Sequence, residues 1–167
     1  MENFLWRAQR ICGQGILSYP MPGHIALPMV AARDIAEAAL HRLVRRDWIG
    51  VRAVSIVGPA EISFEQAALT MERVLNRNIE YTEVSADTFI QELVQSGSGI
   101  NYARSIIETF KDWTLDLPRG QTRTAELIGL TSLAEWTKRE LLPMLDAFGP
   151  PTWPEPTPVR LMEPTIA

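Results

Sequence analysis

The sequence predicts an α/β protein that is mostly helical and has a few short strands. Several stretches repeat apolar residues at the spacing of an amphipathic helix. Between them lie short runs rich in β-branched residues that end at glycine or proline, which is typical of strands. The chain has 167 residues, of which 46% are hydrophobic and 22% charged, and this composition is that of a globular protein with a packed core.

The first part of the chain predicts two helices around one edge strand. Gly15 supplies the permissive backbone that ends the first helix. Pro28 cannot donate a hydrogen bond to a central ladder, so its run is interpreted as a short edge strand. In chain order we expect a helix over residues 3–12, a loop over 19–24, the edge strand over 25–30 and an amphipathic helix over 32–46.

The second part predicts helices that begin at recognisable caps. Ser63 and Gln66 form a capping-box pattern, Ser85 or Asp87 can cap the next helix, and Ser132 opens the last one. We expect a mostly buried strand over 51–57, a helix over 63–76, a half-exposed strand over 79–84, helices over 85–96 and 102–113, a loop over 115–124 and a helix from 131 that Pro143 need not end.

Charge and cysteine content exclude several classes of partner. The net charge of -4, without a long basic stripe, argues against nucleic acid. No apolar run approaches the roughly 20 residues that span a bilayer, so we expect no membrane partner. Cys12 is the single cysteine and no secretory signal opens the sequence, which favours a reducing, cytoplasmic setting. No His, Cys and carboxylate cluster has metal-ligand spacing.

Four local signatures, in order, resemble the C-terminal part of NmrA-like proteins, a branch of the atypical short-chain dehydrogenases/reductases. They are Met1-Glu-Asn-Phe-Leu5, the run from Ile25 to Ala36 with its D-I-A start, Val54 to Gly58 followed by Pro59 and Ser63-Phe64, and Thr131 to Trp136. The resemblance covers residues 1–148 and implies the substrate-side portion of an NAD(P)-binding Rossmann-type fold. Residues 149–167, rich in proline, are expected to form a disordered tail.

The motif that binds a dinucleotide in that family is missing here, and so is the Tyr-x-x-x-Lys pair that carries reduction in ordinary short-chain dehydrogenases. No G-x-x-G-x-x-G is present, and neither Gly13-Gln-Gly15 nor Gly97-Ser-Gly99 has the third glycine. No tyrosine is followed four residues later by lysine. The resemblance implies NAD(P) for a full-length form, and we expect none to be bound by this chain alone. We assign no catalytic residue.

Three residues are candidates for a cleft between substrate and cofactor. The resemblance places Asn3 and Phe4 in the segment that lines this cleft, and the alternative is a helix cap and a core side chain. His24 lies before the edge strand, either at the mouth of the pocket or simply in solvent. Asp34 matches a family position, but its place in a first helical turn is explained by the helix dipole.

Two functional hypotheses follow, and a third concerns the chain itself. The first is the substrate-binding portion of an NmrA-like NAD(P)-dependent oxidoreductase or NAD(P)-binding sensor, which takes a small molecule and does not turn over alone. The second is a non-catalytic interaction module. Since the strand over 53–57 has no intact sheet to join, it would pair with a second copy or a partner chain. The third is that the start is internal and a complete enzyme lies upstream.

Overall fold

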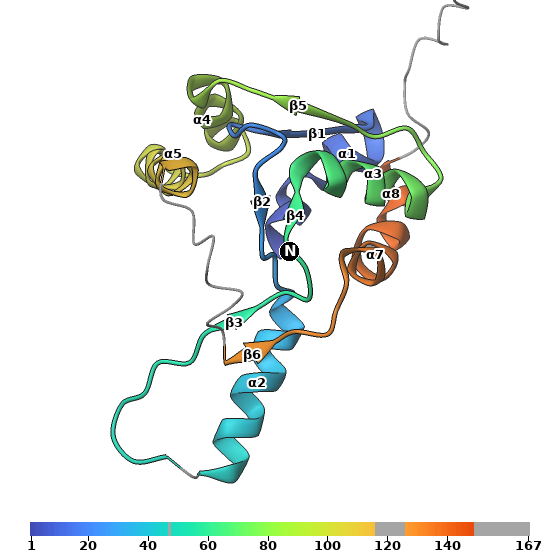
Figure 1. Cartoon of the computed structure of the whole chain (residues 1–167). Coiled ribbons are helices and arrows are strands. Elements are labelled where there is room, and N and C mark those ends of the chain that lie inside the picture. Colours follow the sequence, from blue (N-terminus) through green and yellow to red (C-terminus); the bar gives the residue numbers. More distant parts are fainter. Residues whose placement is uncertain (47, 116–125, 149–167) are drawn as a thin grey trace, which may run out of the picture.

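A computed structural model describes residues 1–46, 48–115 and 126–148 and shows a mixed α/β, mostly helical protein (Figure 1). Its elements, where η marks a 3-10 or π-helix, are η1 (Glu2–Arg7), α1 (Ala8–Gln14), β1 (Ile16–Tyr19), β2 (Ala26–Leu27), α2 (Ala32–Arg45), β3 (Ile56–Val57), β4 (Ile62–Ser63), α3 (Phe64–Leu75), β5 (Glu80–Glu83), α4 (Ala86–Gln95), α5 (Ile100–Leu115), β6 (Leu127–Ile128), α7 (Leu133–Trp136), η2 (Thr137–Leu141), η3 (Leu142–Met144) and α8 (Leu145–Phe148). Of the loop predicted over 115–124, Leu115 is the last residue of α5 and the rest lies outside the described residues, as does the tail predicted over 149–167.

The strands of the described chain form three two-stranded sheets. β1 runs parallel to β5, with Ile16 opposite Glu80 and Tyr19 opposite Glu83. β2 is antiparallel to β4, and β3 is parallel to β6. Each short pair joins two segments that are far apart in the sequence, so the sheets hold together the helices next to those segments.

Side-chain caps begin the helices where the sequence predicts them. Ser63 and Gln66 exchange hydrogen bonds as a complete capping box at the start of α3, and Ser132 does the same with Glu135 before α7. Ser85, not Asp87, caps α4 by accepting from the Thr88 N–H. The last helix continues beyond Pro143 as predicted, because the chain passes through a π-helical and a 3-10 turn before α8.

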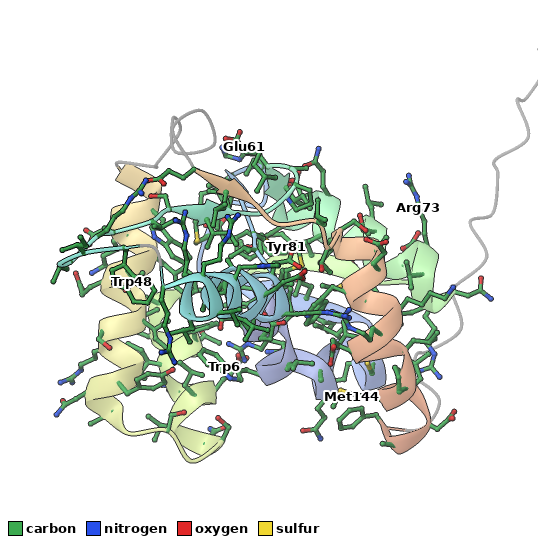
Figure 2. All side chains as sticks on the ribbon, turned by 90° about the horizontal axis from the view of Figure 1, so that it is seen from below. Trp6, Trp48, Glu61, Arg73, Tyr81 and Met144 are labelled. Atoms are coloured by element: carbon green, nitrogen blue, oxygen red, sulfur yellow. The ribbon has the colours of Figure 1, made fainter. Side chains whose placement is uncertain are left out.

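One hydrophobic core joins most of these elements around α3. Its largest fully buried side chains include Trp136, Phe89, Leu17 and Met71, which come from α7, α4, β1 and α3. Figure 2, seen from below, shows side chains filling the space between these elements. Cys12 is buried in the same core, and its burial raises the pKa of the thiol.

The sequence analysis overlooked three strands and overestimated another. β1, β4 and β6 were not predicted, and β1 was missed because three of its four residues are buried in succession, which hides the alternation of a strand. The strand predicted over 51–57 is limited to Ile56–Val57, and the expectation that it is mostly buried is wrong since Val51 is fully exposed. It also has a partner in this chain, because Leu127 and Gly129 donate to the carbonyls of Ser55 and Val57.

Helix α2 projects from the body of the protein (Figure 1), and its large apolar side chains are exposed. We call Ile35, Leu40, Leu43 and Val44 the α2 stripe, and these side chains are between 45% and 72% exposed. Asp34 is the only buried residue of the helix. The amphipathic pattern was therefore read correctly, but its apolar face does not meet the core of this chain.

Asp34 holds α2 to the start of α7. Its carboxylate accepts hydrogen bonds from the Thr131 N–H at 3.0 Å and from the Thr131 hydroxyl at 2.7 Å. Gly129 passes so close that an added Cβ would lie 2.4 Å from the same carboxylate. A structural role was expected for Asp34, but a tertiary hydrogen-bond pair carries it in addition to any effect of the helix dipole.

None of the helices in the described part of the chain is both long and apolar enough to cross a bilayer.

Replacing Asp34 with alanine is expected to destabilise the fold by about 2–3 kcal/mol, since hydrogen bonds to a charged group are lost and buried donors of Thr131 remain unpaired. Urea unfolding followed by circular dichroism measures this change. The control is Glu37→Ala on the same helix, an exposed residue 3.9 Å from His41, which is expected to change the free energy of unfolding by less than about 0.5 kcal/mol. Equal losses in the two variants would contradict the role of Asp34.

Candidate functional site

A cavity of about 320 Å³ opens where η1, the end of β2, β3 and α5 meet. Its walls are mostly apolar and come from segments that are far apart in the sequence. The lining residues are Met1, Asn3, Phe4, Tyr19, Leu27, Pro28, Met29, Val30, Ile56, Val57, Phe64, Phe110 and Trp113. A small concave apolar site with few polar groups is typical of a small-molecule pocket.

Aromatic rings form a continuous wall of this cavity. Phe4 meets Tyr19 edge-on with ring centroids 5.9 Å apart, and Tyr19 lies 4.9 Å from Phe64. On the other side Tyr19 meets Phe110 at 5.8 Å, and Phe110 meets Trp113 at 5.6 Å. Each ring fixes its neighbour in an offset or edge-to-face arrangement, so the wall is formed before any ligand enters.

Tyr19 contributes an uncharged hydroxyl to this wall. The hydroxyl donates a hydrogen bond to the main-chain oxygen of Asn3 at 3.0 Å and so attaches β1 to the first turn of η1. Burial raises the pKa of Tyr19 well above its usual value, while the nearby Arg7 opposes the shift. The hydroxyl therefore remains protonated near neutral pH and acts as a donor, not as a base.

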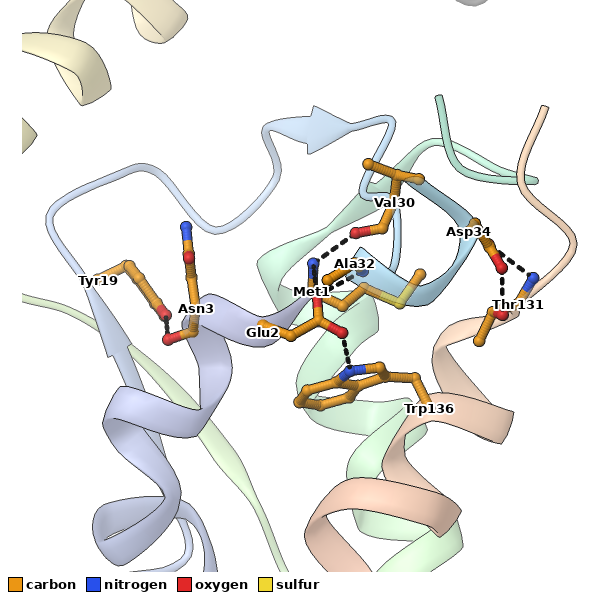
Figure 3. A network of polar contacts seen from close by, with 9 residues as sticks. All are labelled: Met1, Glu2, Asn3, Tyr19, Val30, Ala32, Asp34, Thr131 and Trp136. Atoms are coloured by element: carbon orange, nitrogen blue, oxygen red, sulfur yellow. Dashed lines mark hydrogen bonds and ion pairs between the residues drawn. The ribbon is translucent and has the colours of Figure 1, made fainter. Parts of the chain in front are cut away.

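Glu2 fixes the first turn against two other elements (Figure 3). Its carboxylate accepts from the Ala32 N–H at 2.8 Å and from the Trp136 indole N–H at 3.0 Å. The Met1 ammonium lies 3.4 Å from the carboxylate and donates to the Val30 oxygen at 2.6 Å. These contacts determine where Asn3 and Phe4, the next two residues, stand relative to the cavity.

The ionised form of Glu2 is favoured by these neighbours. Partial burial would raise its pKa, but the hydrogen bonds from Ala32 and Trp136 and the charge of the Met1 ammonium outweigh burial and lower the pKa. Burial in turn lowers the pKa of the Met1 ammonium, with Glu2 opposing that shift.

The three residues predicted for the cleft fall in two places. Asn3 and Phe4 both line the cavity, with Phe4 almost completely buried and Asn3 exposed. Phe4 also packs against Phe64 and Trp136, so it belongs to the core and to the cavity wall together. His24 is exposed and does not line this cavity.

Sequence reasoning missed most of the wall. Tyr19 was placed in a loop, and Met29 and Val57 were considered only as parts of strands. Phe110 and Trp113, which lie in the helix predicted over 102–113, both line the cavity. Their helical spacing on α5 was the available signal, but it did not indicate which element they face.

The described side chains of this cavity offer contacts for binding a small molecule. Asn3, Tyr19 and Trp113 supply its side-chain nitrogen and oxygen atoms, and none of these groups is a nucleophile or a base at neutral pH. In the described part of the chain no three His, Cys, Asp or Glu residues stand close enough to hold a metal.

The glycine pairs do not fit the pyrophosphate of a dinucleotide. Such a group needs a strand followed by a glycine turn and a helix N-terminus. Gly13 and Gly15 instead stand at the passage from α1 to β1, and Gly97 and Gly99 stand between α4 and α5. We therefore derive no chemical step through NAD(P) from these residues.

Comparison with known proteins leaves the resemblance to rest on the local signatures alone: no family model matches the sequence, and no curated protein does.

Replacing Glu2 with glutamine is expected to make stability less sensitive to acid. A lowered pKa in the folded state means that Glu2 stabilises the fold above its unfolded pKa of about 4.3 and loses this effect as the pH falls further. The free energy of unfolding of the variant is expected to be about 1 kcal/mol lower at pH 7. Between pH 5 and 3 its stability is expected to change less with pH than that of the parent. Thermal unfolding at each pH measures both.

Glu80→Gln is the matched control, because Glu80 is exposed on β5. This substitution is expected to leave the dependence of stability on pH unchanged. Parallel profiles for the parent and the Glu2 variant would show that Glu2 is not held in its ionised form by the fold.

Proposed function

We propose that this chain is the substrate-side portion of an NmrA-like NAD(P)-dependent oxidoreductase or NAD(P)-binding sensor, and that its cavity holds the small-molecule substrate. The nucleotide-binding half of the fold would supply the cofactor. The chain therefore binds substrate but does not turn it over alone, and NAD(P) does not bind to it in isolation.

One observation carries this proposal: Asn3 and Phe4, which the resemblance assigns to the substrate cleft, line the aromatic cavity. Glu2 positions both by contacts to α2 and α7, and the D-I-A start and the closing signature of the resemblance lie at those two elements. The order of the signatures along the chain and the geometry of the cavity thus support the same assignment.

Methyl NMR on methionine tests the proposal. Met1 and Met29 line the cavity, whereas Met71 is buried in the core away from it. With 2-acetylnaphthalene and 2-naphthoate as small-molecule probes, at least one is expected to shift the Met29 signal and leave Met71 in place. NADPH and NADH are expected to shift neither. The proposal would be contradicted if either cofactor bound with micromolar affinity, or if neither probe shifted the Met29 signal.

A second candidate function, a non-catalytic interaction module, is favoured by the α2 stripe. Exposed apolar surface of this kind continues into the segment after α2, where Trp48, Ile49 and Val51 are also exposed. Contiguous apolar surface marks association sites. This exposed segment leads along the chain to the strand over 53–57, which the sequence suggested as the site of pairing with another chain. The contact proposed here is made by the α2 helix instead of by the edge of that strand.

We place a second copy of this chain on the stripe. Glu37 lies in the N-terminal half of α2, while Arg42, Arg45 and Arg46 lie at its C-terminal end. Two antiparallel copies would bring the exposed Glu37 of each helix toward the basic end of the other, and their helix dipoles would oppose. The apolar stripes would then meet across the symmetry axis.

The double variant Leu40→Glu with Leu43→Glu is expected to convert a dimer into a monomer, since two charges would be buried at the contact. Size-exclusion chromatography with light scattering at tens of micromolar measures the mass. Leu69→Glu is the control, because Leu69 is an exposed leucine on α3 outside the stripe. A parent chain that is already a stable, monodisperse monomer would remove this second function.

A further inference from the structure

The cavity has features that restrict its ligand more closely than size does. Among the described residues that line it, no side chain carries a charge. The Met1 ammonium at its edge donates a hydrogen bond to the Val30 oxygen and lies 3.4 Å from the Glu2 carboxylate. A ligand with its own charge would lose its hydration without gaining an opposite partner there, which is costly.

The rings define the shape that fits. Tyr19, Phe64, Phe110 and Trp113 all contribute to the lining, and they are already fixed against one another. A planar aromatic group can stack on or meet the edges of such rings, whereas a flexible polar chain gains little from them. At about 320 Å³ the space is near the lower end of the usual range for small-molecule pockets, which limits the ligand to one or two rings.

Asn3 supplies the specific polar contact. Its main-chain oxygen is used by Tyr19, but its side-chain amide makes no hydrogen bond to another residue in the described part of the chain. Figure 3 shows the amide extending away from η1, with Glu2 and Tyr19 directed elsewhere. An amide N–H at the edge of an apolar cavity can donate to one acceptor atom of a ligand.

We propose that the cavity selects an uncharged aromatic compound that carries a hydrogen-bond acceptor, with its rings against the aromatic wall and its acceptor at the Asn3 amide. The inference rests on the proposed function, because it names the substrate class of the same cavity.

Three probes of one ring system separate the parts of the inference. They are 2-acetylnaphthalene, which is uncharged and has an acceptor, 2-naphthoate, which is anionic, and 2-ethylnaphthalene, which has no acceptor. Calorimetric titration of the full chain at pH 7 is expected to show binding of the ketone at least about tenfold tighter than the carboxylate, since burying the unpaired anion is costly. The ketone is expected to bind about fivefold tighter than the hydrocarbon, the equivalent of one neutral hydrogen bond.

Two matched variants locate the polar contact. Asn3→Leu is expected to remove the advantage of the ketone over the hydrocarbon, and the exposed position of Asn3 allows the change without loss of fold. Asn101 is an exposed asparagine of α5 that does not line the cavity, and the Asn101→Leu variant is expected to keep the tighter binding of the ketone over the hydrocarbon.

Each result decides one statement. Equal or tighter binding of 2-naphthoate, with the Met29 methyl shifted, would overturn the uncharged class and leave the substrate-side function standing. Equal binding of ketone and hydrocarbon by the parent would overturn the role of Asn3. No binding of any probe would overturn the inference and the proposed cavity together.

Discussion

The carboxylate of Glu2 is the contact on which the arrangement around the cavity depends. It joins the first turn of the chain to the start of α2, 30 residues away, and to Trp136, 134 residues away. Trp136 is completely buried and packs against Phe4, so this polar contact also fixes an aromatic ring of the core. Together with the hydrogen bond from Tyr19 to Asn3 and the packing of Phe4, it sets where the first turn lies relative to the other elements of the cavity.

A second carboxylate explains how a helix with an exposed apolar side stays attached. The α2 stripe gains nothing from the core of this chain, so hydrophobic burial does not hold the helix in place. Asp34 compensates with two hydrogen bonds to Thr131, both in a buried setting where such bonds are hard to replace by water. Glu2 adds a third anchor at the Ala32 N–H. The helix is therefore positioned by its first turn and leaves its apolar face free.

The sequence predicted features whose signals lie within a few neighbouring residues. Ser63 and Ser132 were recognisable as caps because the residue three positions later completes each box. β3 and β6 could not be recognised as a pair, since each has two residues and its partner lies in a distant part of the chain. The same limit applied to the site: Asn3 and Phe4 came from a local motif, whereas Tyr19 and Phe110 reach the cavity only through the tertiary fold.

Ile56 borders two hollows in the described part of the chain. This residue lines the aromatic cavity, and it also lines a groove between α2 and β6 that contains Arg42 and Leu130. β3 carries Ile56 and is held on one side by β6 and, through the Gly58 N–H, by the Pro28 oxygen of the cavity rim. β3 therefore borders both the cavity and the side of α2 that carries Asp34 and Arg42, a side that does not include the α2 stripe.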